Sequence, residues 1–368
     1  MKLNFWLLSI PFIKFYVSLS QPVLVKTYYD DSTQTKVKEE FFLKSVEDSI
    51  IEGTYKKYYE SGPLEILGYY KNGKRDSIFI EYYPKGELKA RYSYKDGKRQ
   101  GEFIGYSQDG KIIQKAYFVD DQLQDTVYSF YPNGNIKLKS RFINGMIQGK
   151  VFEYYPNGIL KSEAEFKDNK PHGLTITYYP TGIKQTEENY KKGILNGFFR
   201  TYYPSGILET ESVNVDGKLE GYYKNYFPSG KLSKEGTYWA GEQHGLCKVY
   251  YESGKIHMEL NFHKGKKSGT SKIYYENGKL KEKAYYTNDE KDKNIIQYNE
   301  QGVRIAELTY INNKKFGQWK YYHPNGTLKC IENYLNDRLC GERKIFNENG
   351  VLIAEEIYNP AGKKKWNM

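Results

Sequence analysis

The sequence has little of what disulfide scaffolds, metal centres and active sites are built from. Its 368 residues include 3 cysteines and 5 histidines, and no two cysteines form a Cys-x-x-Cys pair. This scarcity excludes a disulfide-rich fold and disfavours a zinc site. No nucleophile–base pair and no set of metal ligands recurs or clusters. We therefore predict no catalytic residue, no metal site, no cofactor and no enzymatic activity.

Apolar residues are also scarce for a chain of this length. The hydrophobic fraction is 39%, although Tyr occurs 39 times and aromatic residues reach 17%. Disordered chains lack aromatic residues, and a single large core would need a more apolar composition. The formal net charge of +11 comes from 56 basic and 45 acidic residues that are interleaved along the chain. The composition favours a thin, ordered structure with much surface per residue.

The first 20 residues differ from the rest and resemble a secretion signal. A basic start at Met1–Lys2 precedes an apolar stretch over residues 3–13, and residues 18–20 offer small side chains for cleavage before Gln21. The stretch is shorter than the roughly 20 apolar residues of a membrane-spanning helix. We expect residues 1–20 to be a signal peptide that exports the protein to the periplasm, cell surface or medium. Lys14 interrupts the apolar pattern, and a cytoplasmic protein is expected if it disables the signal.

A glycine recurs every 24 residues, from Gly62 to Gly350, without insertion or deletion. Counting from this turn glycine, every unit has an aromatic residue at position −4. Eleven units have Leu or Ile at +2, and twelve have an aromatic residue at +8. A fixed period of this length is typical of repeat architectures. We predict thirteen repeats over residues 51–362.

Each repeat reads as two strands and two tight turns. In residues 155–158, Tyr-Pro-Asn-Gly, proline sets the backbone angle of the turn and glycine takes the left-handed conformation. A second turn of similar composition follows, and we expect three-residue loops at both turns. Tyr154 would then pair with Leu160, and Phe166 with Lys170. This register puts positions −4, +2 and +8 on one face as an apolar spine, with charged residues and the −3 tyrosine on the opposite face.

One such unit cannot bury its own apolar face, so neighbouring units must stack. We predict an all-β fold, an elongated single antiparallel sheet of about thirteen hairpin repeats, shaped as a twisted rod or trough. Residues 21–50 are expected to form an N-terminal cap with a degenerate repeat. Residues 363–368 are expected to form a basic tail, in which Lys363–Lys365, together with Pro360, blocks further strand pairing.

The repeat unit has the pattern aromatic-x-x-Gly-x-Leu, followed by the aromatic residue at +8. In ten repeats a second glycine lies nine residues before the next turn glycine. Ser77, Asp125 and Lys293 replace it in the others. This pattern resembles the bacterial variant of the MORN repeat over 312 of the 368 residues. Proteins of this type include the YwqK-like family, which is labelled as antitoxin, and membrane- or protein-binding scaffolds. The resemblance implies a binding role without catalysis and brings no active-site residues with it.

The tyrosines at position −3 are the sequence's candidate binding residues. Tyrosine offers a large contact area at small entropic cost, which is why binding surfaces favour it. The alternative is that these rings pack against one another across strands. The row consists of Tyr59, Tyr83, Tyr131, Tyr155, Tyr179, Tyr203, Tyr251 and Tyr275.

Other recurring polar residues have ordinary explanations. His172 and His244 occupy the same turn position three repeats apart, too far for a shared metal, and His257 and His263 lack a third ligand. Glutamates at +5 recur about 9.6 Å apart, beyond the reach of one calcium ion. Cys330 and Cys340 are expected to be free thiols. The five glutamates are Glu163, Glu187, Glu211, Glu235 and Glu259.

We therefore expect a non-enzymatic scaffold for protein–protein interaction, with an antitoxin- or immunity-like role as its narrower form. Two alternatives are a cell-surface or carbohydrate-binding module and a module for anionic membranes. The carbohydrate alternative would depend on few tryptophans, since only Trp239, Trp319 and Trp366 follow the signal. Nucleic acid is disfavoured as a partner because acidic residues are interleaved with the basic ones.

Overall fold

The computed structural model describes residues 21–30, 32–47 and 49–365. The expected signal peptide, residues 1–20, and the last three residues, with Trp366, lie outside this description. The chain divides into two compact units, unit 1 up to Met146 and unit 2 from Ile147. The described residues form strands and contain no helix, hence no helix that could span a membrane.

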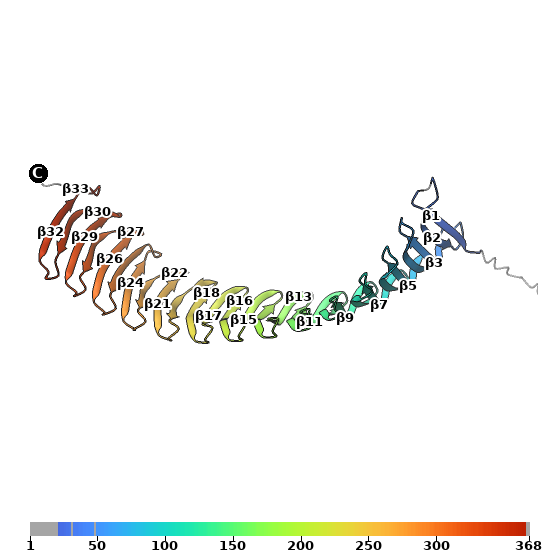
Figure 1. Ribbon diagram of the computed structural model, residues 1–368, viewed down its shortest axis with the longest axis horizontal. Coiled ribbons are helices and arrows are strands. Elements are labelled where there is room, and N and C mark those ends of the chain that lie inside the picture. Colours follow the sequence, from blue (N-terminus) through green and yellow to red (C-terminus); the bar gives the residue numbers. More distant parts are fainter. Residues whose placement is uncertain (1–20, 31, 48, 366–368) are drawn as a thin grey trace, which may run out of the picture. The chain divides into compact units, whose positions relative to one another are not determined.

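Unit 1 is an open antiparallel sheet in which consecutive strands pair (Figure 1). Its strands are β1 Val23–Tyr28, β2 Val37–Leu43, β3 Ile51–Tyr58, β4 Leu64–Lys71, β5 Lys74–Tyr82, β6 Leu88–Lys95, β7 Lys98–Tyr106, β8 Ile112–Val119, β9 Gln122–Phe130 and β10 Ile136–Ile143.

Unit 2 has the same construction. Its strands, of which the first starts one residue before the unit boundary, are β11 Met146–Tyr154, β12 Leu160–Lys167, β13 Lys170–Tyr178, β14 Lys184–Lys191, β15 Ile194–Tyr202, β16 Leu208–Val215, β17 Lys218–Tyr226, β18 Leu232–Trp239, β19 Glu242–Gln243, β20 Gly245–Tyr250, β21 Ile256–His263, β22 Lys266–Lys267, β23 Gly269–Tyr274, β24 Leu280–Thr287, β25 Asp292–Tyr298, β26 Arg304–Ile311, β27 Lys314–Lys315, β28 Gly317–Tyr322, β29 Leu328–Leu335, β30 Arg338–Leu339, β31 Gly341–Phe346, β32 Leu352–Tyr358 and β33 Lys364–Lys365. The predicted fold class, an all-β open antiparallel sheet of hairpin repeats, is confirmed.

The first turn of the repeat has the predicted geometry. Tyr154 pairs with Leu160, and the turn between them is closed by a hydrogen bond from the Tyr155 amide to the Ile159 carbonyl at 2.8 Å. Gly158 has a φ of 86°, which a residue with a side chain adopts only at a cost. The turn glycine therefore sets the 24-residue period because its backbone conformation is needed once in each repeat.

The second turn differs from the prediction. Lys167 pairs with Lys170 and Phe166 with Pro171, so the loop contains two residues, Asp168 and Asn169, instead of three. Both loop residues have positive φ, 51° and 63°. This is the conformation of the tight hairpin turn that Asn, Asp and Gly favour, and it matches the composition that the sequence shows there.

The predicted apolar spine is wrong because each repeat contains two irregularities in its register. After the first turn, Glu153 pairs with Ser162, so Lys161 is an extra residue in its strand. A shift of one residue reverses the faces of the side chains beyond it. Position −4 and position +8 therefore lie on opposite faces of the sheet.

A second bulge, two residues wide, surrounds the second glycine of the repeat. Ala164 pairs with Thr175 while Phe166 pairs with Pro171, and Gly173 between them has a φ of 96°. The repeat with Lys293 in this position has no such bulge, since its pairs stay in register from Glu282 to Asp292. There the extra residues lie in the turn, at 288–291. A left-handed residue is therefore needed at this position only where the bulge is present, and Ser77 and Asp125 supply it in place of glycine, with φ of 61° and 63°.

Buried side chains gather on one face, which we name the core face. It carries positions −7, +4, +6 and +8, and cross-strand pairs such as Phe79–Tyr92 and Val127–Ser140 join −7 to +6. The buried side chains of the described residues occupy these positions. They are Phe79, Ala90, Ala116, Phe118, Val127, Ser140, Ser212, Asn214, Cys247, Ser271, Ala284, Ala306, Trp319 and Cys330.

Aromatic rings connect successive repeats along the core face. In unit 1 the ring of Tyr70 lies 5.3 Å from that of Tyr55 and 5.6 Å from that of Phe79. In unit 2, Trp319 lies 5.1 Å from Tyr310 and 5.0 Å from Tyr334. Aromatic pairs at these distances stabilise a fold beyond their buried area, by about 0.5–1.5 kcal/mol each.

Two structural details concern the first and last strands. Strands β1 and β2 pair as a hairpin, and the ring of Phe41 in β2 stacks on Tyr55 of β3 at 6.4 Å.

At the other end of the chain, Lys364 and Lys365 form β33 and pair with Tyr358 and Ile357. The expectation that this lysine run blocks strand pairing is therefore wrong.

Candidate functional site

The −3 tyrosines follow the first strand of each repeat and are half-buried in all eight cases. The hydroxyl of Tyr179 donates a hydrogen bond of 2.8 Å to the carbonyl of Tyr202 in the next repeat. Six others donate in the same way to the −4 residue one repeat on, at 2.7–2.9 Å: Tyr59, Tyr83, Tyr155, Tyr203, Tyr251 and Tyr275. The remaining member, Tyr131, is also half-buried. These contacts give the row a part in joining repeats, and its role in binding stays a prediction.

The face opposite the core, which we name the open face, carries positions −8, −6, −4, +5 and +7. In the middle of unit 2 the +5 glutamates Glu211, Glu235 and Glu259 alternate across the strands with basic residues at −6. The strand pairing places Glu211 between Arg200 and Lys224. Their charged groups lie 3.7 and 3.9 Å from the carboxylate. Charges in this column of unit 2 therefore largely neutralise one another.

The −4 tyrosines also belong to this face, which explains why they cannot form the predicted spine. The hydroxyl of Tyr202 donates to Glu187 at 2.8 Å. The same bond recurs one repeat at a time at 2.7–3.0 Å in Tyr226–Glu211, Tyr250–Glu235 and Tyr274–Glu259, and again in Tyr322–Glu307. Four of the five recurring glutamates, Glu187, Glu211, Glu235 and Glu259, are therefore hydrogen-bonded partners of these tyrosines.

Burial and this hydrogen bond shift the ionisation of the tyrosines. Burial first, then the bond to the glutamate, raises the pKa of Tyr202 to about 12. The same causes raise the pKa of Tyr226 and Tyr250 to about 12. These phenols are therefore proton donors throughout the neutral range, and they hold the carboxylates in fixed positions.

A stripe of exposed apolar side chains runs beside the charged column in unit 2. Leu174, Phe198, Tyr222 and Leu246 occupy position −8 of four consecutive repeats, with exposed fractions of 43%, 48%, 37% and 43%. The guanidinium of Arg200 lies 5.3 Å from the centre of the Phe198 ring. Exposed apolar groups that gather in this way mark interaction surfaces. We name these four residues the apolar stripe.

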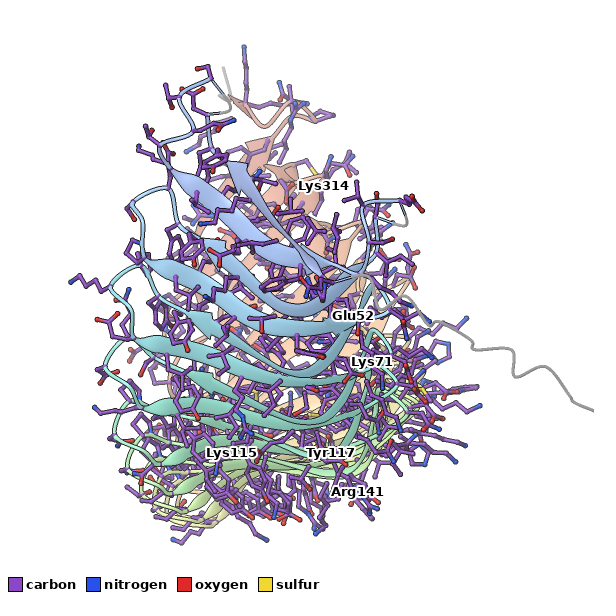
Figure 2. All side chains as sticks on the ribbon, turned by 90° about the vertical axis from the view of Figure 1, so that its right-hand side faces the viewer. Glu52, Lys71, Lys115, Tyr117, Arg141 and Lys314 are labelled. Carbon is purple, nitrogen blue, oxygen red and sulfur yellow. The ribbon has the colours of Figure 1, made fainter. Side chains whose placement is uncertain are left out.

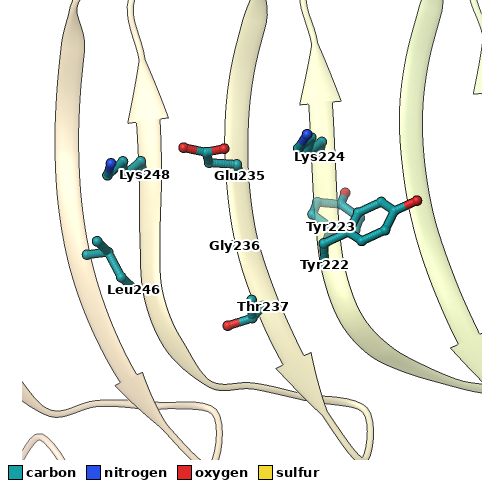
Figure 3. A pocket seen from close by; sticks show the side chains of 8 residues that line it. All are labelled: Tyr222, Tyr223, Lys224, Glu235, Gly236, Thr237, Leu246 and Lys248. Atoms are coloured by element: carbon teal, nitrogen blue, oxygen red, sulfur yellow. The ribbon is translucent and has the colours of Figure 1, made fainter.

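A shallow cavity of about 240 Å³ lies where the stripe meets the charged column (Figure 3). Figure 3 shows Lys224, Glu235 and Lys248 in one row across the strands, with Tyr222 and Leu246 in a second row. The side chains from these two rows offer cationic, anionic and apolar contacts within one short segment of the sheet. Such a mixture suits recognition of another surface.

Sequence reasoning missed the stripe because it depends on the register. Large apolar residues recur at −8 with the same 24-residue spacing, which is a signal that the sequence does contain. Assigning them to an exposed face requires knowing that the bulge separates −4 and −8 from the core.

The histidines form no metal site. The Nδ1 atom of His172 accepts a hydrogen bond from the amide of Lys192 at 3.5 Å. The rings of His244 and His263 lie 5.1 Å apart, and Trp239 lies 5.5 Å from His244. Sequence spacing did not reveal this cluster, because its members come together only when repeats stack. Among the described residues no group of three or more His, Cys, Asp or Glu side chains could hold a metal ion.

The cysteines are free thiols, as their spacing predicted. Cys330 is buried on the core face and Cys340 is half-buried. The Cys340 amide donates a hydrogen bond of 2.8 Å to the Asn333 carbonyl. Burial is the main cause that raises the pKa of the Cys330 thiol, which makes it a poor nucleophile.

Comparison with known families agrees with this architecture. The MORN repeat variant model matches residues 51–72, 75–96, 99–120, 126–144, 147–168, 171–192, 219–240, 243–264, 267–288, 317–336 and 339–359. These segments make up more than half of the chain, and the chain belongs to the MORN repeat variant family. It is a repeat scaffold. The unmatched segments 193–218 and 289–316 contain the repeats with Asn214 at +8 and with Lys293.

The search of curated proteins gives no match. Among solved structures, the chain is similar to the crystal structure of TcdB2-TccC3, with 11% identity and a TM-score of 0.16 over 89% of this chain and 20% of that chain. The crystal structure of TcdB2-TccC3-Cdc42 matches with 11% identity and a TM-score of 0.13 over 93% of this chain and 26% of that chain. The chain thus spans about a fifth to a quarter of those chains. Likeness at these TM-scores carries no argument about function.

Proposed function

We propose that this protein is a non-enzymatic scaffold that binds a protein partner along the open face. The apolar stripe is the observation that supports this most strongly. Four exposed apolar side chains in successive repeats leave apolar surface in water, and a partner that covers them gains roughly 25 cal/mol for each Å² buried. The adjacent charged column would orient the partner and exclude unsuitable ones.

Site-specific crosslinking in the native host tests this proposal. A photoreactive phenylalanine analogue replaces Phe198 in the stripe, and the matched control carries the same analogue at Val215, which is 46% exposed but lies beside the second turn. We expect one defined protein adduct from position 198 and none of that mass from position 215. Identical adducts from both positions, or none from either, would count against the proposal.

An antitoxin- or immunity-like role is the narrower form of the proposal and rests on the resemblance to YwqK-like proteins. Its test is co-expression: the chain should restore growth to cells that produce a toxin encoded beside it. Restored growth that is lost in F198D/Y222D would support this role. Restored growth that is indifferent to the stripe would assign the binding to another surface.

Export is also proposed, on the basis of residues 1–20. Mass spectrometry of the protein isolated from its host should find a mature chain that starts at Gln21, in the periplasm, on the cell surface or in the medium. A full-length chain confined to the cytoplasm would contradict export.

The carbohydrate alternative has less support than protein binding. Trp319 is only 3% exposed and packs between Tyr310 and Tyr334, so its ring is not available to a sugar. Trp239 is 64% exposed. The membrane alternative also has less support, because the +5 glutamates of unit 2 neutralise cations that would attract an anionic surface.

A further inference from the structure

The charged column of the open face changes character in unit 1. At +5, where unit 2 has a run of glutamates, unit 1 has Arg91, Lys115 and Lys139 in successive repeats. Strand pairing places Arg91 between Ile80 and Ile104. These neighbours are apolar, whereas the corresponding neighbours of Glu211 in unit 2 are Arg200 and Lys224, which complement its charge.

The same arrangement continues along the column. Lys115 lies between Ile104 and Tyr128, and Lys139 pairs with Tyr128. The Lys139 ammonium lies 5.9 Å from the centre of the Tyr128 ring. Cations and apolar side chains therefore alternate strand by strand, and we name these three cations the basic column.

Little acidic charge neutralises Arg91 and Lys115. Arg91 lies 3.8 Å from Glu102, and both side chains are about half exposed, a geometry that contributes little energy in water. Lys115 is exposed and makes no ion pair among the described residues. The neighbouring position +7 adds a further cation, Arg141, instead of an acid.

A cavity of about 390 Å³ adjoins the column on the same face. Tyr117, 45% exposed, and Arg141 both line it, together with Gln124 and Asp125. Figure 2 shows Tyr117 of β8 and Arg141 of β10 on the same side of the sheet, with β9 between their strands. The face therefore offers an exposed ring and a guanidinium beside the three cations.

We infer that the open face of unit 1 docks an acidic amphipathic helix of the protein partner. Strands lie about 4.8 Å apart, so the cations recur about every 9.6 Å with an apolar side chain halfway between them. One face of an α-helix advances about 5.4 Å per turn, so acidic and apolar residues on alternate turns match this spacing closely. An extended strand does not match it, since its side chains return to the same face about every 6.7 Å.

This inference rests on the proposed function and specifies the chemistry of the partner. The contrast between the units favours a compact acidic segment over a long polyanion. In unit 2, Glu211, Glu235 and Glu259 neutralise the cations of their column, so that column offers a nucleic acid or an anionic membrane little attraction. A protein segment can be acidic in one part and apolar in another.

The test uses the full chain and a fluorescein-labelled helical peptide with glutamate at every seventh position and leucine halfway between. Its matched control has glutamine in place of glutamate. Fluorescence anisotropy at low salt should show the glutamate peptide binding about tenfold more tightly, with the difference shrinking as salt is added. Equal affinities of the two peptides would overturn the inference.

Two triple variants separate the basic column from general charge. R91Q/K115Q/K139Q should abolish the preference for the glutamate peptide. K218Q/K266Q/K314Q removes three exposed cations beside the second turns of unit 2, outside the charged column, and should leave the preference intact. Circular dichroism and urea midpoints establish that both variants fold. Equal losses in both variants would refute the assignment.

Further outcomes distinguish this inference from the proposed function. If duplex DNA or phosphatidylserine vesicles displace the peptide from the basic column and bind more tightly, the inference is wrong about the class of partner. If the peptide fails to bind while crosslinking at Phe198 succeeds, only the inference falls. If the peptide binds and crosslinking fails, the inference stands and the stripe of unit 2 loses its role.

Discussion

Replacing Gly68 by alanine should destabilise unit 1, although alanine is common at the same position of other repeats. Gly68 is buried at +6 in the middle of β4, and its φ is not left-handed. A Cβ atom built there would lie 2.3 Å from Cε1 of Phe79. Because that distance is far below van der Waals contact, the Phe79 ring or the strand must move.

The expected cost follows from two opposing effects. Replacing a glycine in a strand interior by alanine stabilises the folded state by roughly 0.5–1 kcal/mol. Overpacking a core destabilises it by about 1–3 kcal/mol. The net loss should therefore be about 0.5–2 kcal/mol. Gly236 is a matched control at the same position in unit 2. Its Cβ would meet Cys247 at 3.5 Å, an ordinary contact, so G236A should be neutral or stabilise by up to about 1 kcal/mol.

Hydrogen exchange measured by mass spectrometry resolves the effect by strand. G68A should accelerate exchange in β4 and β5 and lower the urea midpoint, while G236A should do neither. A second substitution then tests the cause. Two repeats further along the chain, Ala116 and Val127 occupy the positions of Gly68 and Phe79 and pack in one cluster. G68A/F79V should therefore be more stable than the sum of the two single effects, by about 1–2 kcal/mol.

If G68A proves as stable as G236A, or if F79V adds to its cost without any coupling, steric conflict with the Phe79 ring is not what selects glycine there. The packing assigned to the core face of unit 1 would then be incorrect.

Three further predictions concern the turns, the tyrosine row and the pH response. G173V should lower the free energy of unfolding by about 1–3 kcal/mol, because the φ of 96° at Gly173 disfavours side chains. K293V, in the repeat without a bulge, should change the free energy of unfolding by less than about 0.5 kcal/mol. Equal urea midpoints of the two variants would contradict this prediction. Y179F removes one hydrogen bond between repeats and should lower the free energy of unfolding in urea by about 0.5–1.5 kcal/mol. An unchanged free energy of unfolding would show that solvent replaces this bond. Burial and the bond to Glu187 raise the pKa of Tyr202 from 10.0 to about 12 in the folded chain. The stability that this group contributes is therefore complete below pH 10 and is lost as the pH rises toward 12. Absorbance titration at alkaline pH should show a high-pH step that Y202F reduces.

The repeat period and the hairpins could be read from the sequence because they depend on local chemistry. Gly158 must adopt a left-handed conformation, and its neighbours Pro156 and Asn157 favour the same turn. These preferences act within a few residues, so they predicted the pairing of Tyr154 with Leu160 correctly. The repeat of the turn glycine every 24 residues then predicted the stacking, since one repeat has too little apolar surface to stand alone.

The faces of the sheet could not be read in this way. The predicted spine combined Tyr154 with Phe166, but Lys161 adds one residue between their strands and reverses the second side chain. Nothing in the composition of that strand marks the bulge. The apolar stripe and the basic column depend on the same assignment, and so neither could be recognised before the register was known.

The amino-acid sequence by itself determined the 24-residue period and the places where the chain turns. Only the tertiary structure decided which side chains are buried and which are left for a partner. The physical reason is that bulges and edge contacts are fixed between repeats: the Gly193 amide donates to the Pro171 carbonyl, and the Tyr179 hydroxyl donates to the Tyr202 carbonyl. Such hydrogen bonds satisfy backbone groups of neighbouring repeats, and their geometry is absent from any single repeat.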